Sequence, residues 1–281
     1  MKKIGFIDYY ISEWHANNYP KWIKEASEQI GVECSVAYAY AELDVSPVDG
    51  VTTDEWCEKF GANRCSSIEE LCELSDYICI LAPSNPEKHL EYVRAAFPFS
   101  KPTYVDKTFA PDYEIAFEIF ALAKKYGTPF FSSSALRFAD ELKDVDGAKS
   151  LIVMGHGSDF DEYVIHLCEI AVRIMGSAPD RVKLERQGRS QYVIRGEYDD
   201  GRGCTVLFAP GLPYSVCAEL EEGHVYRKLE SPYFLLLIKE ILEFYLSGKA
   251  PFNTDETLDV MKLREGAITA RSLQGTVIDL K

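Results

Sequence analysis

Lys107 and the polar residues near it carry the clearest chemical signal in this sequence of 281 residues. Two short apolar runs, 77–82 and 103–105, each end at a polar turn, and a segment of helix length separates them. Such nearly continuous runs predict buried strands of a parallel sheet. Because the ligand crevice of an open α/β sheet lies beyond the carboxyl ends of its strands, the residues after both runs are expected in one cleft. These residues are Ser84, Asn85, Asp106, Lys107 and Thr108.

A lysine just past a buried strand can be partly desolvated, which helps it to release its proton and so to protonate or polarise a substrate oxygen. Lys107 is therefore a candidate catalytic residue. From position alone, a solvated loop lysine is the more common situation, so this interpretation needs further support.

His166 is the second candidate, near the start of a helix predicted over 163–175, with Glu162 four residues before it and Glu169 three residues after it. Both carboxylates can share the helical face of the imidazole, orient it and raise its basicity. The alternative is a structural histidine that is paired with a neighbouring carboxylate. His156, between two glycines, is a further candidate substrate contact. No cluster of His, Asp and Glu has the spacing of metal ligands, so no metal centre is predicted.

Four segments of the chain follow one another in the order of the landmarks of a known family. Asp-Lys-Thr at 106–108 resembles the Glu-Lys-Pro signature of the glucose-fructose oxidoreductase / inositol dehydrogenase (Gfo/Idh/MocA) family. Ala-Pro followed by His, within 82–89, resembles its Thr-Pro and His turn. The segment 165–176 resembles its Gly-x-His-x-x-Asp and Leu-Gly segment, and 251–261 resembles the start of its last helix. The resemblance therefore covers nearly the whole chain.

The resemblance implies an oxidoreductase that transfers hydride between a nicotinamide cofactor, NAD or NADP, and a sugar, polyol or related hydroxy compound. In that reaction His166 would take the hydroxyl proton, Lys107 would stabilise the developing alkoxide, and Glu162 would position His166. The predicted cofactor contacts are Asp8, Tyr10, Ile11, Ser12, Pro83, Ser84, Asn85, His89 and Asp106. The predicted substrate contacts are Lys107, Arg137, His156 and Glu169.

The first turn departs from the family pattern. Between a strand predicted over 3–7 and a helix predicted over 19–30, the chain reads Asp-Tyr-Tyr-Ile-Ser-Glu-Trp from residue 8, without the glycines that let a backbone approach a pyrophosphate. Asp8 would also repel phosphate. His15 resembles the histidine that follows the family's glycines. We therefore expect a nicotinamide nucleotide to bind weakly or in a shifted pose.

Two other functions stay open beside the oxidoreductase. One is a family member that has lost nucleotide binding and serves as a small-ligand binding or partner subunit. The other is a lyase or isomerase that uses Lys107 and His166 for acid/base work without net redox.

The fold class predicted is α/β, with a Rossmann-like parallel sheet in an N-terminal domain, 1–138, and an α+β domain with an antiparallel sheet in 139–281. The strands predicted for the second domain are 182–186, 191–198, 204–208, 214–220 and 224–229. The helices predicted to cover that sheet are 163–175 and 232–246, and a final helix is predicted over 255–272.

A net charge of −15 makes nucleic acid and anionic membranes unsuitable partners, because a phosphate backbone requires a basic surface. Eight cysteines without a Cys-x-x-Cys pair predict buried free thiols in a reducing compartment. No run of membrane-spanning length is present. We expect a cytoplasmic protein with a sugar-like small-molecule substrate.

A homodimer or homotetramer is also expected, because the family resemblance points to dimers that meet sheet to sheet. The apolar residues predicted on the outer face of the second sheet are Tyr192, Ile194, Val206 and Phe208. A large apolar patch of this kind usually marks an interface.

Overall fold

The computed structural model describes residues 1–273 and 275–281. The chain divides into two compact units, and each unit consists of two segments that alternate along the sequence with those of the other. Unit 1 consists of Met1–Ser133 and Phe234–Thr254, and unit 2 of Ser134–Tyr233 and Asp255–Lys281. The predicted domains, 1–138 and 139–281, assign 234–254 to the second domain, whereas the structure assigns it to the first.

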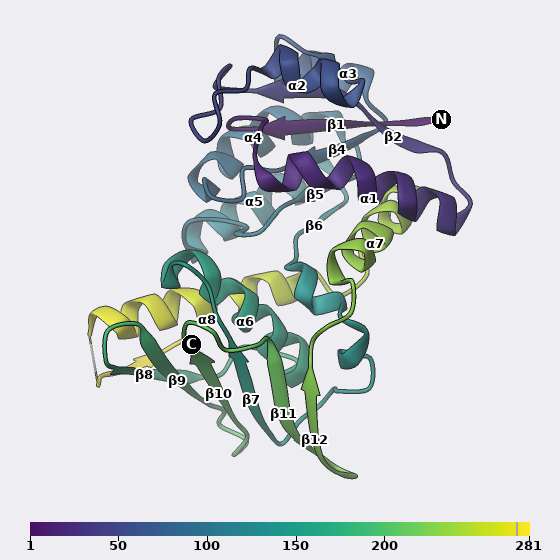
Figure 1. Ribbon diagram of the computed structural model, residues 1–281. Coiled ribbons are helices and arrows are strands. Elements are labelled where there is room, and N and C mark those ends of the chain that lie inside the picture. The colour runs from purple at the N-terminus through teal and green to yellow at the C-terminus, as the bar shows by residue number, and fades with distance from the viewer. Residues whose placement is uncertain (274) are drawn as a thin grey trace. The chain divides into compact units, whose positions relative to one another are not determined.

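Unit 1 is built on a parallel sheet, as predicted, with six strands in the order β3-β2-β1-β4-β5-β6 (Figure 1). The strands are β1 (Lys2–Asp8), β2 (Cys34–Ala41), β3 (Asn63–Arg64), β4 (Tyr77–Ile80), β5 (Thr103–Val105) and β6 (Phe130–Phe131). The helices are α1 (Trp14–Ile30), α2 (Thr53–Phe60), α3 (Ile68–Leu74), α4 (His89–Ala96), α5 (Tyr113–Tyr126) and α7 (Tyr233–Ser247), with short 3₁₀ turns η1 (Pro86–Lys88) and η2 (Phe97–Phe99). Since β1 lies between β2 and β4, the strand order reverses there, where α/β sheets bind their ligands.

Helix α7 covers the parallel sheet, which corrects the prediction that 232–246 covers the antiparallel one. The Tyr245 hydroxyl donates to the backbone oxygen of Ile78 in β4 at 2.7 Å, and its ring stacks on Tyr77 at 4.7 Å. Phe244 packs edge-on against Phe131 of β6, with ring centroids 5.0 Å apart. The apolar periodicity of this helix shows that it is buried, but not against which sheet.

Unit 2 contains a seven-stranded sheet in the order β12-β11-β7-β10-β9-β8-β13. Its strands are β7 (Ser150–Gly155), β8 (Arg181–Gln187), β9 (Gln191–Glu197), β10 (Gly203–Phe208), β11 (Ser215–Leu220), β12 (Gly223–Lys228) and β13 (Val277–Asp279). Its helices are α6 (Phe160–Met175) and α8 (Asp255–Ser272), with 3₁₀ turns η3 (Ala135–Phe138) and η4 (Asp140–Leu142). The sheet is antiparallel as predicted, apart from the parallel pair of β7 and β10. The predicted fold class is thus confirmed.

The outer face predicted for this sheet is wrong, because Ile194, Val206 and Phe208 are buried on the inner face. The ring of Phe160 in α6 lies 5.3 Å from Phe208 and 4.5 Å from the fourth predicted residue, Tyr192. The apolar residues of the opposite face are instead Ile152, Met154, Val193 and Leu207, which are half-buried or exposed. Strand alternation defines two faces, but the packing of α6 decides which one is covered.

All eight cysteines are free thiols and seven of them are buried, as predicted. Among the described residues, no helix has both the length and the apolar character required to cross a membrane.

Candidate functional site

Two buried charged residues follow the carboxyl end of β5. Asp106 and Lys107 come directly after the strand and are 1% and 9% exposed. The backbone N–H of Lys107 donates to Oδ1 of Asp106 at 2.8 Å, and the Tyr104 hydroxyl lies 3.1 Å from the same oxygen. The Asp106 carboxylate is therefore held by its own strand and by the residue that follows it.

His15, in the first turn of α1, completes this cluster. Its Nδ1 lies 2.5 Å from Oδ2 of Asp106, and its ring stacks on that of Tyr19, with the ring centroids 5.3 Å apart. Burial acts to raise the pKa of Asp106, but His15 and Lys107 outweigh it and hold the pKa below its usual value. An imidazole held by a carboxylate beside a lysine can give and take protons. His15 is absent from the predicted catalytic set; a histidine just after the first turn was the available signal.

In the turn between β1 and α1, the Asp8 carboxylate forms hydrogen bonds within the chain. Asp8 is 1% exposed, and its Oδ1 accepts hydrogen bonds from the backbone N–H groups of Tyr9, at 2.7 Å, and Ala82, at 3.1 Å. Burial, followed by repulsion from Glu13, raises the pKa of Asp8 well above its usual value. The other predicted cofactor contacts of this turn are Tyr10, which is half-buried, and Ile11 and Ser12, which are buried.

Beyond β4, the cofactor contact predicted for His89 stays a prediction. This residue is fully buried, and its Nδ1 and Nε2 lie 3.0 Å and 2.5 Å from the backbone oxygens of Phe109 and Leu81. Burial lowers the pKa of His89. Both ring nitrogens face main-chain oxygens, so His89 joins two loops of unit 1. Pro83 is also buried, whereas Ser84 is exposed and Asn85 is half-buried.

In unit 2, His166 and His156 both lie close to the ring of Tyr214. The ring centroid of Tyr214 is 5.0 Å from that of His156 and 6.3 Å from that of His166. The Tyr214 hydroxyl donates to the backbone oxygen of His156 at 2.8 Å. His166 Nδ1 lies 2.7 Å from the Ser134 hydroxyl, and its ring lies 5.8 Å from Tyr163. None of these hydroxyl residues was predicted: Ser134 and Tyr214 are far from His166 in sequence, whereas Tyr163 is one turn before it on α6.

The predicted substrate contacts Arg137 and Glu169 pair with each other. Arg137 Nη1 lies 2.8 Å from Oε1 of Glu169, and both side chains are 5% exposed. Arg137 also pairs with Glu256 of α8. A substrate contact by either residue stays a prediction. Glu162, predicted to position His166, is half-buried one helical turn before it on α6.

Lys107 belongs to unit 1 and His166 to unit 2. That both residues act on one substrate, as the family resemblance implies, stays a prediction.

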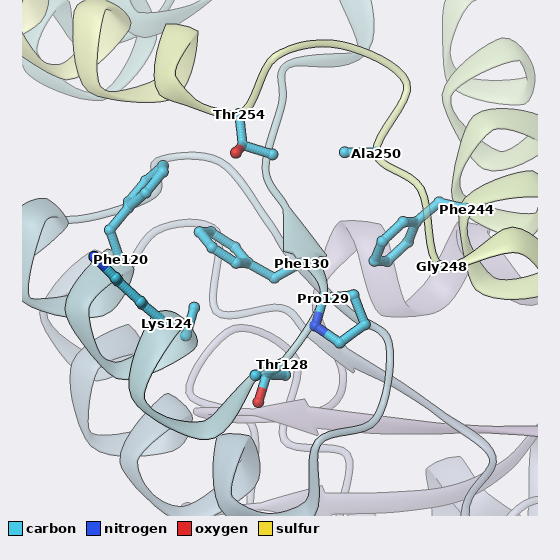
Figure 2. Close-up of a pocket in the computed structure, with 11 residues that line it drawn as sticks. Phe120, Lys124, Thr128, Pro129, Phe130, Phe244, Gly248, Ala250 and Thr254 are labelled. Carbon is cyan, nitrogen blue, oxygen red and sulfur yellow. The ribbon is translucent and has the colours of Figure 1, made fainter.

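A pocket of about 470 Å³ lies in unit 1 (Figure 2), and neither Asp106 nor Lys107 lines it. Phe120, Phe130 and Phe244 contribute its aromatic walls, and Lys124 also lines it. The pocket includes 127–130, at the amino end of β6, whereas Asp106 and Lys107 follow the carboxyl end of β5. We therefore do not assign the chemistry to this pocket. Across the described residues, no three or more His, Cys, Asp and Glu side chains are grouped so as to hold a metal ion.

Solved structures share this fold, although no protein-family model and no curated protein matches the chain. A putative myo-inositol dehydrogenase from Sinorhizobium meliloti has a TM-score of 0.78 at 10% identity, over 100% of both chains. An oxidoreductase from Agrobacterium radiobacter, in complex with NAD+, L-tartaric acid and magnesium, has a TM-score of 0.76 at 14% identity, over 99% of this chain and 98% of the other. The chain has the fold of the Gfo/Idh/MocA-type inositol dehydrogenases. A putative NADPH-dependent oxidoreductase from Desulfitobacterium hafniense also matches, with a TM-score of 0.75 at 12% identity over 99% and 97% of the two chains.

The first turn of this inositol dehydrogenase fold does not fit a pyrophosphate in the usual place. The carboxylate of Glu13 accepts hydrogen bonds from the backbone N–H groups of His15, at 2.8 Å, and Ala16. These are the donors that a dinucleotide fold offers to phosphate. The buried Asp8 adds a second acidic group where the first glycine of the fingerprint belongs.

Proposed function

We propose that this protein is an enzyme that exchanges protons with a sugar, polyol or related hydroxy or carbonyl compound. The observation that carries the proposal is the buried cluster of Asp106, Lys107 and His15 at the carboxyl end of β5. This edge of a parallel sheet is where α/β proteins bind small ligands. A positioned acid or base at such an edge contributes about 10²–10⁴-fold to a proton transfer.

The residues of the two units suggest distinct roles. The Lys107 side chain would stabilise negative charge that develops on a substrate oxygen. His15, whose Nδ1 contacts the Asp106 carboxylate, would exchange protons with Lys107 or with the substrate. In unit 2, His166 would take a hydroxyl proton, and the Ser134 hydroxyl at its Nδ1 would fix the ring.

The first candidate reaction is the oxidation of a hydroxyl group with NAD or NADP, which would accept the hydride when bound. The structural neighbours favour it, because they include a putative myo-inositol dehydrogenase, an oxidoreductase in complex with NAD+ and a putative NADPH-dependent oxidoreductase. The first turn counts against the usual binding mode of either nucleotide, because its backbone N–H groups are already hydrogen-bonded to Glu13.

The second candidate is a lyase or isomerase reaction without net redox, and that first turn favours it. Such a reaction needs the proton-transfer groups but no hydride acceptor. A protein that only binds a small ligand or a partner subunit would show neither reaction.

A panel of inositols, sugars and hydroxy acids in D₂O separates these candidates. Redox chemistry is read from nicotinamide absorbance after NAD+ or NADP+ is added, and proton exchange from deuterium incorporation by NMR without nucleotide. We expect at least one compound to give one of the two signals, nicotinamide reduction or deuterium incorporation at carbon, and its rate to fall by about a hundredfold or more in Lys107→Met. Lys124→Met is the matched control, because Lys124 lines the pocket at the other edge of the sheet. Equal rates for wild type and Lys107→Met, or no exchange and no redox with any compound, would reject the proposal.

A further inference from the structure

Glu13 places an internal anion at the start of α1. Its carboxylate accepts hydrogen bonds from the backbone N–H groups of His15 and Ala16, and the residue is 9% exposed. The residues usual at this capping position are Ser, Thr, Asp and Asn, whose short side chains satisfy one or two N–H groups of the first turn. The same N–H groups, with the positive end of the helix dipole, attract phosphate in dinucleotide-binding proteins.

The donors next to this carboxylate are paired as well. The backbone N–H of Glu13 donates to the oxygen of Ile11 at 2.9 Å, and that of Asn17 donates to the oxygen of Glu13 at 2.9 Å. At the end of β4, the N–H of Ala82 donates to Asp8 at 3.1 Å. The chain therefore uses its own oxygens to satisfy these N–H groups around the first turn.

The charge around Glu13 also opposes a phosphate. The carboxyl groups of Asp8 and Asp106, each 1% exposed, interact electrostatically with Glu13. Burial raises the pKa of both Asp8 and Glu13, which is the response of acidic groups enclosed together. A carboxylate that stays ionised here would repel a phosphate charge 4 Å away by about 4 kcal/mol, and the pKa of Asp106 is held below its usual value.

On the side of the crevice that would hold adenosine, the polar groups form hydrogen bonds within the chain. The Ser12 hydroxyl donates to Oδ2 of Asp49 at 2.8 Å, and the Ser46 hydroxyl donates to the backbone oxygen of Ser12 at 2.9 Å. These bonds fasten the segment after β2 to the first turn.

The carboxylate after β2 is engaged too. A carboxylate near this position normally binds the adenosine ribose. Here Glu42 accepts from the Lys88 ammonium at 2.6 Å and from the Tyr92 hydroxyl at 2.9 Å.

We propose that Glu13 is a built-in replacement for the phosphate anion and that it closes the start of α1 to dinucleotides. The inference goes beyond the proposed function, because the cluster at the end of β5 can exchange protons with or without a nucleotide. The ligand expected at the carboxyl edge of the sheet is then a small molecule without a pyrophosphate group.

Calorimetry with ADP-ribose, which carries the adenosine and pyrophosphate but no nicotinamide, tests this proposal. The variants are Glu13→Ser and Glu13→Asn, because both new residues are good helix caps and should retain α1. We expect wild type to bind with a Kd above about 1 mM and the variants to bind at least about tenfold more tightly. Glu28→Ser, on the exposed side of α1, is the control with the same change in net charge.

A micromolar Kd for wild type would overturn the proposal. So would folded Ser and Asn variants that bind no better than wild type, or a control that gains as much affinity as they do. Thermal unfolding identifies which variants are folded. The wild-type Kd tests the proposal even if no variant folds. Failure here is distinct from failure of the proposed function, since deuterium incorporation is measured without any nucleotide.

Discussion

Replacing Arg137 by methionine tests whether the buried ion pair of unit 2 stabilises the fold. The substitution leaves the Glu169 carboxylate, which is 5% exposed, without the guanidinium 2.8 Å away. Removing one partner of a buried ion pair costs about 3–5 kcal/mol, since the remaining charge stays in a poorly solvated place. We therefore expect the free energy of unfolding to fall by about 3 kcal/mol or more and the melting temperature by roughly 10 °C.

Two controls separate this effect from the loss of any arginine. Arg94 pairs with Glu118 on the surface of unit 1, where the side chains are 56% and 42% exposed. Arg94→Met should change the free energy of unfolding by less than about 1 kcal/mol. The double variant Arg137→Met/Glu169→Leu removes both buried charges and should recover at least half of the loss.

Urea unfolding followed by circular dichroism, at about pH 5 and about pH 8, gives the required free energies. In Arg137→Met, burial without a cation should raise the pKa of Glu169. A raised pKa in the folded state gives stability that is present at low pH and lost as the pH rises, so the deficit relative to wild type should be larger at about pH 8. A deficit below about 1 kcal/mol at both pH values, or a double variant no more stable than the single one, would refute this reasoning.

Three further outcomes are expected. His166→Ala should lower turnover of the true substrate by about a hundredfold or more with unchanged circular dichroism, and near-normal turnover would argue against its role as a base. Because burial and Glu13 raise the pKa of Asp8, wild-type stability should decline as the pH rises from about 4 towards that raised pKa. Asp8→Asn should flatten this decline in urea unfolding, and an unchanged slope would show that Asp8 does not cause it. We also propose a homodimer or homotetramer that meets through the outer sheet face of unit 2; light scattering should show a lower mass for Ile152→Glu but not for Val48→Glu, and a monomeric wild type would exclude it.

The sequence by itself determined the local structure, because the causes of local structure lie within a few residues. The apolar runs at 77–82 and 103–105 predicted strands that the structure shows as β4 and β5. The placement of Asp106 and Lys107 at the end of a buried strand followed from the same pattern. The helix predicted over 255–272 matches α8, since its periodic apolar residues and polar boundaries are visible in sequence.

Only the tertiary structure decided which distant groups meet. The pairing of His15 with Asp106 joins residues that are far apart in the chain, and no local pattern specifies such a contact. The same holds for the packing of Tyr245 on β4, which assigns α7 to unit 1. Glu13 could be read as a surface acid from its type, and only its contacts reveal it as the cap of α1. The sequence specifies the chemistry of each side chain. Its partners depend on how the sheets and helices pack, because neighbours in space determine burial and charge pairing.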